Sequence, residues 1–236
     1  SEHMTTFQPY VHNFVGAVLD DSLGPVMTTV ASAMQYSSII YQIPPTDSIT
    51  DIVSKVLHSS MMGYNVISAS PISAETFTKE EVMRLMQLSI FLPIIQFSDS
   101  VLDYFNDPHV KEMWEGCKET RKFWDIETKI SQHLLTNLTA PLYTPVWWGS
   151  GDEHNPDLRT HTEFMFSDLY FVAPIVDVNS TSRVVHFPKG DTVWFWTSNK
   201  LGNAAETYTK SVFKGGDTEE FTNLRLYDLL VFLRVG

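Results

Sequence analysis

The stretch from Thr162 to Thr197 reads TEFMFSDLYFVAPIVDVNSTSRVVHFPKGDTVWFWT, and the rest of the chain is best interpreted outward from it. It predicts three or four short strands, in FMFSDLYFVAPIV, RVVHFPKG and DTVWFWT, which are separated by an Asp-Val-Asn-Ser-Thr-Ser turn and a Pro-Lys-Gly-Asp turn. Apolar and aromatic side chains alternate with polar ones, as a half-buried antiparallel sheet requires. This part of the chain is therefore expected to be all-β.

Ahead of this stretch, short apolar strands alternate with amphipathic helices. Strands are predicted at 14–19, 38–43, 65–70, 93–97 and 143–148. Helices are predicted after a cap at Asp47 or Ser48, from Thr78 onward and over 110–135, and residues 25–35 also have helical character. Short strands that are apolar throughout are typical of a parallel sheet buried on both faces. A doubly wound sheet and a (β/α)₈ barrel both fit, but no glycine-rich turn follows the first strand, so nothing supports a dinucleotide-binding fold.

The composition excludes several classes of partner. The chain has 236 residues, of which 43% are hydrophobic, enough for the cores of one or two domains. It carries 16 basic and 28 acidic residues, and no basic cluster is longer than Arg121-Lys122. Nucleic acids and anionic membranes are therefore not expected as partners. No apolar run approaches the roughly 18 residues of a membrane span, and the first residues do not resemble a signal peptide, so no membrane insertion is expected.

Cysteine, asparagine and histidine usage adds further expectations. Cys117 is the only cysteine, so an intrachain disulfide is impossible, and a small buried apolar role is favoured over a bond to another chain. Asn137-Leu138-Thr139 and Asn179-Ser180-Thr181 match the N-glycosylation pattern, which favours the secretory pathway, extracellular or lysosomal. The acidic loop 149–154 has no second His/Asp cluster at ligand spacing, so no metal and no cofactor are expected.

The stretch 162–197 resembles the junction in glycoside hydrolase family 31 where the catalytic barrel gives way to a β-sandwich, which reads close to QFMFGDALLVAPV…R.VYLPKG.WYDFWTG. The resemblance extends over most of the chain, and it is strongest to the branch that includes myogenesis-regulating glycosidase. It is carried by AVLDDSL, IIYQIPPTDSI, GYNVISASPISA, EEVMRLMQLSIFLPIIQFS, LYTPVWWGSGDE and NLRLYDLLVFLRVG.

This resemblance implies a fold class of α/β followed by all-β. Residues 1–150 would supply strands four to eight of a (β/α)₈ barrel, and residues 151–236 the proximal C-terminal β-sandwich. Half a barrel presents unpaired backbone edges, and each unsatisfied buried group costs about 1–3 kcal/mol. The expected partner is therefore a second chain that carries barrel strands one to three and the N-terminal β-domain. The alternative is a fragment repacked as an open sheet.

The resemblance also implies a catalytic pair. Retaining glycosidases use two carboxyl groups roughly 5 Å apart, at the carboxyl ends of the barrel strands. Asp20 matches the nucleophile, with Asp21 as a one-residue alternative, and Asp47 matches the acid/base. The competing interpretation is local, because Asp-Asp-Ser and Thr-Asp-Ser are also ordinary helix caps and turns.

Several positions depart from the family pattern. Gln42 and Thr46 stand where the family has arginines, and Ser70 stands where it has a substrate-binding aspartate. A sugar site depends on charged groups that orient hydroxyls, so their loss predicts an eroded site. Trp147 or Trp148 is expected to stack on a sugar, and strand alternation would send the other into the core.

Two functions are compatible with these residues. In the first, the chain is a subunit of an active two-chain retaining α-glycosidase. In the second, it is a pseudoenzyme that acts as a binding or assembly subunit, with carbohydrate as a candidate ligand. The lost arginines and aspartate favour the second.

Overall fold

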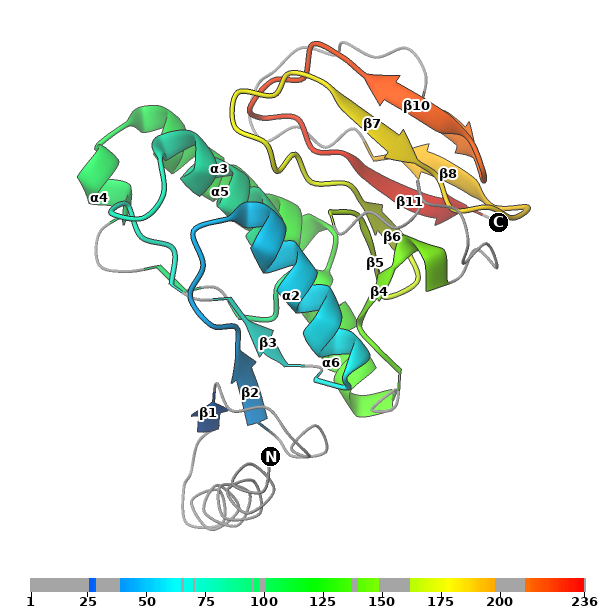
Figure 1. The fold of residues 1–236 in the computed structure, drawn as a ribbon, viewed down its shortest axis with the longest axis horizontal. Helices are drawn as coiled ribbons and strands as arrows, with labels where there is room; N and C mark the ends of the chain where they lie inside the picture. Colours follow the sequence, from blue (N-terminus) through cyan, green and yellow to red (C-terminus); the bar gives the residue numbers. More distant parts are fainter. Residues whose placement is uncertain are drawn as a thin grey trace, which may run out of the picture.

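The structure is a computed structural model that describes residues 26–28, 39–64, 66–69, 71–94, 96–97, 101–136, 140–148, 162–197 and 211–235. A helical layer with a small parallel sheet lies beside two antiparallel sheets, as Figure 1 shows. The expected change from α/β to β architecture along the chain is therefore present.

The parallel sheet contains β1 (Val26–Thr28), β2 (Ile39–Gln42) and β3 (Ile67–Ser68), in that order. Segment 93–97 was expected to be a strand, and its described residues join the sheet through two isolated parallel bridges, Ser68 to Ile94 and Ile72 to Phe97. The helical character predicted for 25–35 is wrong at β1, because Val26–Thr28 pairs in parallel with β2. The expected strand at 14–19 lies outside the described residues.

Local capping signals place the first two helices correctly. Helix α2 (Ile49–Met61) begins after Ser48, whose side chain accepts from the Asp51 backbone N–H. Helix α3 (Lys79–Ser89) begins after Thr78, which forms a capping box with Glu81. A short helix, α4 (Val101–Phe105), precedes the next long one.

The single helix expected over 110–135 is two helices. Helix α5 (Pro108–Phe123) ends at Trp124, and α6 (Ile126–Thr136) begins after Asp125, whose φ is 52°. Trp124 and Ile126 are both buried, at 6% and 0% exposed. Residues two apart point to different sides of a continuous helix, so burying both in one core favours a break between them.

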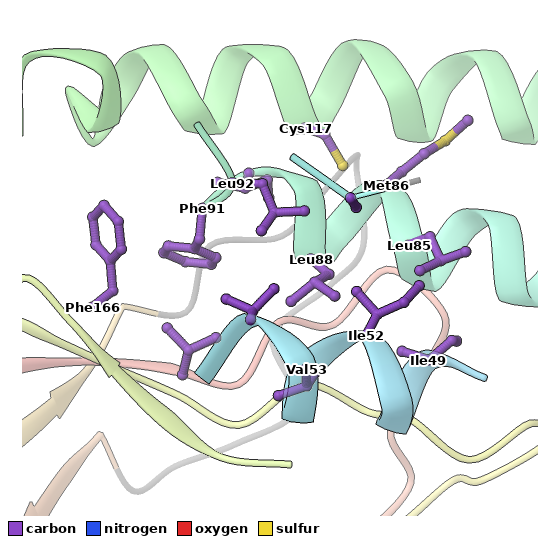
Figure 2. Packing of buried hydrophobic residues seen from close by; sticks show 14 of the residues in the cluster. Ile49, Ile52, Val53, Leu85, Met86, Leu88, Phe91, Leu92, Cys117 and Phe166 are labelled. Atoms are coloured by element: carbon purple, nitrogen blue, oxygen red, sulfur yellow. The ribbon is translucent and has the colours of Figure 1, made fainter. Parts of the chain in front are cut away.

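Helix α3 lies between α2 and α5, and side chains from all three fill the first hydrophobic core (Figure 2). Ile52 of α2 faces Leu85 and Leu88 of α3, while Cys117 of α5 lies near Met86. Phe164, Phe166, Tyr170 and Val172 of the antiparallel sheet belong to the same core. The helical layer and the sheet are therefore packed as one body.

The larger antiparallel sheet has the order β4-β5-β6-β11-β8-β9. Its strands are β4 (Tyr143–Pro145), β5 (Phe164–Phe166), β6 (Tyr170–Val172), β11 (Val231–Val235), β8 (Val193–Trp196) and β9 (Val212–Lys214). The strand expected at 143–148 ends early, because Val146–Trp148 forms a 3₁₀ helix. Among the described residues β4 pairs only with β5, and antiparallel, so it does not extend the parallel sheet.

A second sheet pairs β7 (Arg183–His186) with β10 (Thr218–Phe221). The second core joins the two antiparallel sheets, since Val185, Phe187 and Phe221 cluster with Phe171, Trp194, Trp196, Phe213 and Phe232. In Figure 1, β7 and β10 lie alongside β8 and β11. The antiparallel strands predicted from the 162–197 stretch are confirmed. The boundary at residue 150 stays a prediction, although β4 precedes it and is hydrogen-bonded to β5 beyond it.

Two polar side chains of α3 tie the helical layer to the loop before β11. Gln87 donates to the Leu226 carbonyl at 2.5 Å, and Arg84 reaches the same oxygen at 3.4 Å. Burial lowers the pKa of Arg84 to about 10, against the opposing effect of Glu80 and Asp228. In the part of the chain that the structure describes, no helix has the length and apolar character needed to cross a membrane.

Candidate functional site

Asp47, the predicted acid/base, lies in the turn between β2 and α2, and its side chain is exposed. Its neighbours form the cap of α2. Thr46 Oγ1 donates to Asp51 Oδ2 at 3.2 Å and accepts from the Ser48 backbone N–H at 3.3 Å, while Ser48 Oγ accepts from the Asp51 N–H at 3.4 Å. The cap is therefore Ser48, and no hydrogen bond or ion pair with another described residue involves the Asp47 carboxylate.

The groups that replace the expected arginines now have local roles. Gln42 is the last residue of β2 and pairs with Ser68 of β3. Thr46 takes part in the cap, and Asp51 forms an ion pair with Lys55 at 3.4 Å. A neutral amide and a hydroxyl cannot supply the bidentate, charged hydrogen bonds of a guanidinium. The turn after β2 thus stabilises the start of a helix and supplies one exposed carboxylate.

Asp20 and Asp21 lie outside the described residues, and so do Ser70 and Asn137. The strand beside β2 is Val26–Thr28, which follows Asp20 in the sequence and does not end at it. The adjacency of Asp20 and Asp47 stays a prediction. That prediction assumes that the expected strand 14–19 lies next to β2. The structure describes β1 and β3 as the neighbours of β2.

Trp147 and Trp148 lie in the 3₁₀ helix, with their ring centroids 6.0 Å apart. Trp147 is half-buried and packs against the second core, whereas Trp148 is 54% exposed. The strand expected here is wrong, because these residues form a 3₁₀ helix, but the expected outcome that one ring packs against the core and the other is exposed is confirmed. Trp148 lines a small cavity of about 70 Å³ together with Asp168 and Arg234. An exposed indole beside polar groups can stack on the apolar face of a sugar.

Asn179 occupies an exposed turn before β7 and has a φ of 59°. Its backbone N–H donates to Glu80 Oε1 at 3.1 Å, which fixes the turn against α3. Thr181, the acceptor-site hydroxyl, is exposed as well. The sequon at Asn179 is thus sterically open to modification.

Residues 162–197 and 211–235 contain a polar cleft that no sequence motif marked. Its volume is about 320 Å³, and its lining includes Glu163 and Arg183, which form an ion pair at 3.4 Å. The Glu163 side chain is 1% exposed and that of Arg183 is 11% exposed. Glu163 and Arg183 are 20 residues apart in the sequence, so no local motif links them. The alternation of polar and apolar residues along the strands was the one sequence signal that bore on these two positions.

Cys117 is free and buried, as expected, and burial raises the pKa of its thiol. A thiol in such surroundings is a poor nucleophile. Among the residues that the structure describes, no group of three or more His, Cys, Asp or Glu side chains could hold a metal ion.

Sequence comparisons identify related proteins of much greater length. The SITS-binding protein of Tetronarce californica is 24% identical over 239 residues, covering 95% of this chain and 32% of that protein. The myogenesis-regulating glycosidase of Mus musculus is 25% identical over 170 residues, covering 63% of this chain and 22% of that protein. The chain therefore spans about a third or less of these curated relatives. No protein-family model matches it.

Solved structures show the same architecture. A glucosidase II alpha subunit superposes with a TM-score of 0.67 over 90% of this chain and 23% of its own, at 13% identity. A GH31 alpha-xylosidase from a soil metagenome superposes with a TM-score of 0.56 over 77% of this chain and 29% of its own, at 14% identity. The chain is therefore similar to glycosidases of family 31.

The family 31 likeness fits the observed division into a helical part and antiparallel sheets. It accounts for most of the chain, and it corresponds to parts of the glycosidase domains rather than to a whole enzyme. At these identities the structural likeness establishes the fold and leaves the chemistry to be argued from the residues themselves.

Proposed function

We propose that this family 31-like chain is a catalytically eroded subunit that binds or assembles with a second chain. The observation that carries the proposal is the turn around Asp47, where Thr46, Ser48 and Asp51 are committed to capping α2. A retaining glycosidase needs its acid/base held close to a nucleophile and to groups that orient the sugar. Among the described residues, no hydrogen bond or ion pair links the Asp47 carboxyl group to a second carboxyl group or to a cation.

An assembly role is supported by the edges of the parallel sheet. Within the described residues its strands are β1, β2 and β3 with two single bridges beyond, and β4 pairs elsewhere. We propose that these strands belong to a (β/α)₈ barrel, and that a second chain carries barrel strands one to three and the N-terminal β-domain. Pairing with that chain would satisfy the edge groups of β1 and leave the sandwich unchanged. The two sequons, with Asn179 exposed, support a secretory-pathway location for the proposed assembly.

The alternative is an active two-chain retaining α-glycosidase, in which Asp20 is the nucleophile and Asp47 the acid/base. One observation favours it. Asp47 is retained although no described partner requires it, so its carboxylate is free to act on a ligand.

Hydrolysis of aryl α-glucosides and aryl α-galactosides by protein isolated from its source tests these functions, with Asp47→Asn and Asp51→Asn as the variant and its matched control. The eroded function predicts no turnover for any of them. Turnover that Asp47→Asn removes and Asp51→Asn retains would overturn it in favour of the active glycosidase.

Native mass spectrometry of the same material tests the assembly. A stoichiometric second chain is expected, and a lone mass near that of this chain, 26.9 kDa, would refute it.

A further inference from the structure

The polar cleft is formed by Thr162 and Glu163 ahead of β5, by residues 175–182 between β6 and β7, and by β7 itself. Its polar lining is made by Thr162, Glu163, Asp177, Ser180, Ser182, Arg183 and His186. Ile175 and Val184 add an apolar component. A volume of about 320 Å³ lies at the lower end of the range for small-molecule sites. The cleft can therefore hold one small ligand.

The charges of the cleft are largely compensated internally. Arg183 and Glu163 pair at 3.4 Å, so neither presents an unbalanced charge. Burial lowers the pKa of the Arg183 guanidinium, and the nearby Glu163 and Asp177 carboxylates oppose that effect. Because the ion pair is neutral overall, Asp177 is the carboxylate of the lining that lacks a compensating charge, and it disfavours a free anion. A neutral polar ligand avoids this repulsion and can use the donors and the acceptors of the cleft together.

Hydrogen-bonding capacity in the cleft remains unused. All described bonds of the Arg183 guanidinium go through Nη2, to Thr162 Oγ1 at 2.9 Å, to the Thr162 carbonyl at 3.4 Å and to Glu163 at 3.4 Å. Its Nε is buried and makes no hydrogen bond, and Nη1 has no partner among the described residues. The exposed Asp177 carboxylate is an acceptor, and His186, bonded to Thr218 through Nδ1 at 3.1 Å, leaves Nε2 available.

We infer that the polar cleft is a binding site for a neutral polyhydroxylated ligand, a single hexose-sized carbohydrate unit. Each sugar hydroxyl donates and accepts, so it pairs with carboxylate acceptors and guanidinium donors in the same site. Ile175 and Val184 would cover the apolar C–H face of the ring. The site is separate from the turn at Asp47 and depends on neither proposed function.

The test is ligand-observed NMR titration of the full chain with glucose, galactose, mannose and N-acetylglucosamine, and with acetate and methylammonium as the anionic and the cationic probe. At least one sugar is expected to bind saturably and the charged probes are not. Asp177→Asn should weaken sugar binding by roughly tenfold, the loss expected for one charged hydrogen bond. Asp191→Asn, an exposed carboxylate outside the cleft, is the matched control and should leave binding unchanged.

Arg183→Gln is a second variant that should also weaken sugar binding. If Arg183→Gln does not fold, Asp177→Asn still decides the test, because Asp177 is exposed and its replacement leaves the Glu163–Arg183 ion pair intact. The inference is overturned if no sugar binds, if only the charged probes bind, or if Asp177→Asn binds as well as Asp191→Asn. Sugar binding that is lost only in Asp47→Asn would also overturn it, because that result locates the sugar at the turn after β2.

Discussion

Breaking the Glu163–Arg183 ion pair should destabilise the fold strongly. Both partners are nearly enclosed, at 1% and 11% exposed, and their closest atoms lie 3.4 Å apart. Removing one partner leaves the other as an uncompensated buried charge, which typically costs about 3–5 kcal/mol. Arg183→Met should be the more damaging single change, because it strands the carboxylate that is the more deeply buried of the two.

Replacing both residues at once should recover much of this loss. In Glu163→Gln/Arg183→Met no charge remains buried, and such replacements are often close to neutral. The double variant should therefore be less destabilised than the sum of the singles, with a coupling of about 2–3 kcal/mol. In thermal terms the singles should lower Tm by roughly 6–20 °C, at about 2–4 °C per kcal/mol for a chain of this size.

Urea denaturation followed by circular dichroism measures each free energy of unfolding, with m unchanged if the compactness of the states is unchanged. The matched control is the exposed pair Lys118–Glu115, whose atoms are closer, at 2.7 Å, but whose side chains are 46% and 67% exposed. Its coupling should not exceed about 1 kcal/mol. If the buried pair proves additive within about 0.5 kcal/mol, the reasoning from burial is wrong.

Three further predictions follow from the described residues. Gly215→Ala should cost about 1–3 kcal/mol or more, because its Cβ would lie 2.5 Å from the Gly190 carbonyl oxygen, whereas Gly116→Ala inside α5 should stabilise by about 0.5–1 kcal/mol; equal effects in denaturation would contradict this. Burial lowers the pKa of His133 despite its bond to the Ala140 carbonyl, so stability should fall as pH drops from about 6.5 through the folded pKa, and His133→Gln should flatten that slope. Protein from secreting cells should lose one glycan mass in Asn179→Gln, and an unchanged mass would show that this exposed sequon is not used.

Sequence reasoning succeeded where structure is determined locally. The helix starts at Ser48 and Thr78 followed from residues within one turn, and the strands of 162–197 followed from alternation and turn residues. It failed where distant residues decide. Val26–Thr28 is a strand because β2 is available as a parallel neighbour, and Val146–Trp148 leaves the strand because Trp147 packs into the second core.

The candidate sites divide in the same way. Asp47 could be chosen as a candidate from the sequence because the family resemblance marks its position. The hydrogen bonds around it could not be predicted, because Thr46 would also fit a substrate-binding loop, and only the structure shows that it bonds to Ser48 and Asp51. The Glu163–Arg183 cleft carries no motif, because its members come from segments that meet only after the two antiparallel sheets have formed.

Stability and chemistry make opposite demands on the turn after β2. A catalytic turn holds charged groups toward a ligand, often at a cost to the fold, whereas a capping hydroxyl contributes about 1 kcal/mol to a helix that is already buried against the core. The hydrogen bonds of Thr46, Ser48 and Asp51 stabilise the start of α2 and do not hold charged groups toward a ligand. Asp47 is exposed and makes no hydrogen bond or ion pair among the described residues, so the fold does not account for its presence, but one carboxylate without groups that orient a ligand is not enough for catalysis. The positions where the family has arginines are more informative than the carboxylate, and the presence of Gln42 and Thr46 at these positions supports the eroded subunit that we propose.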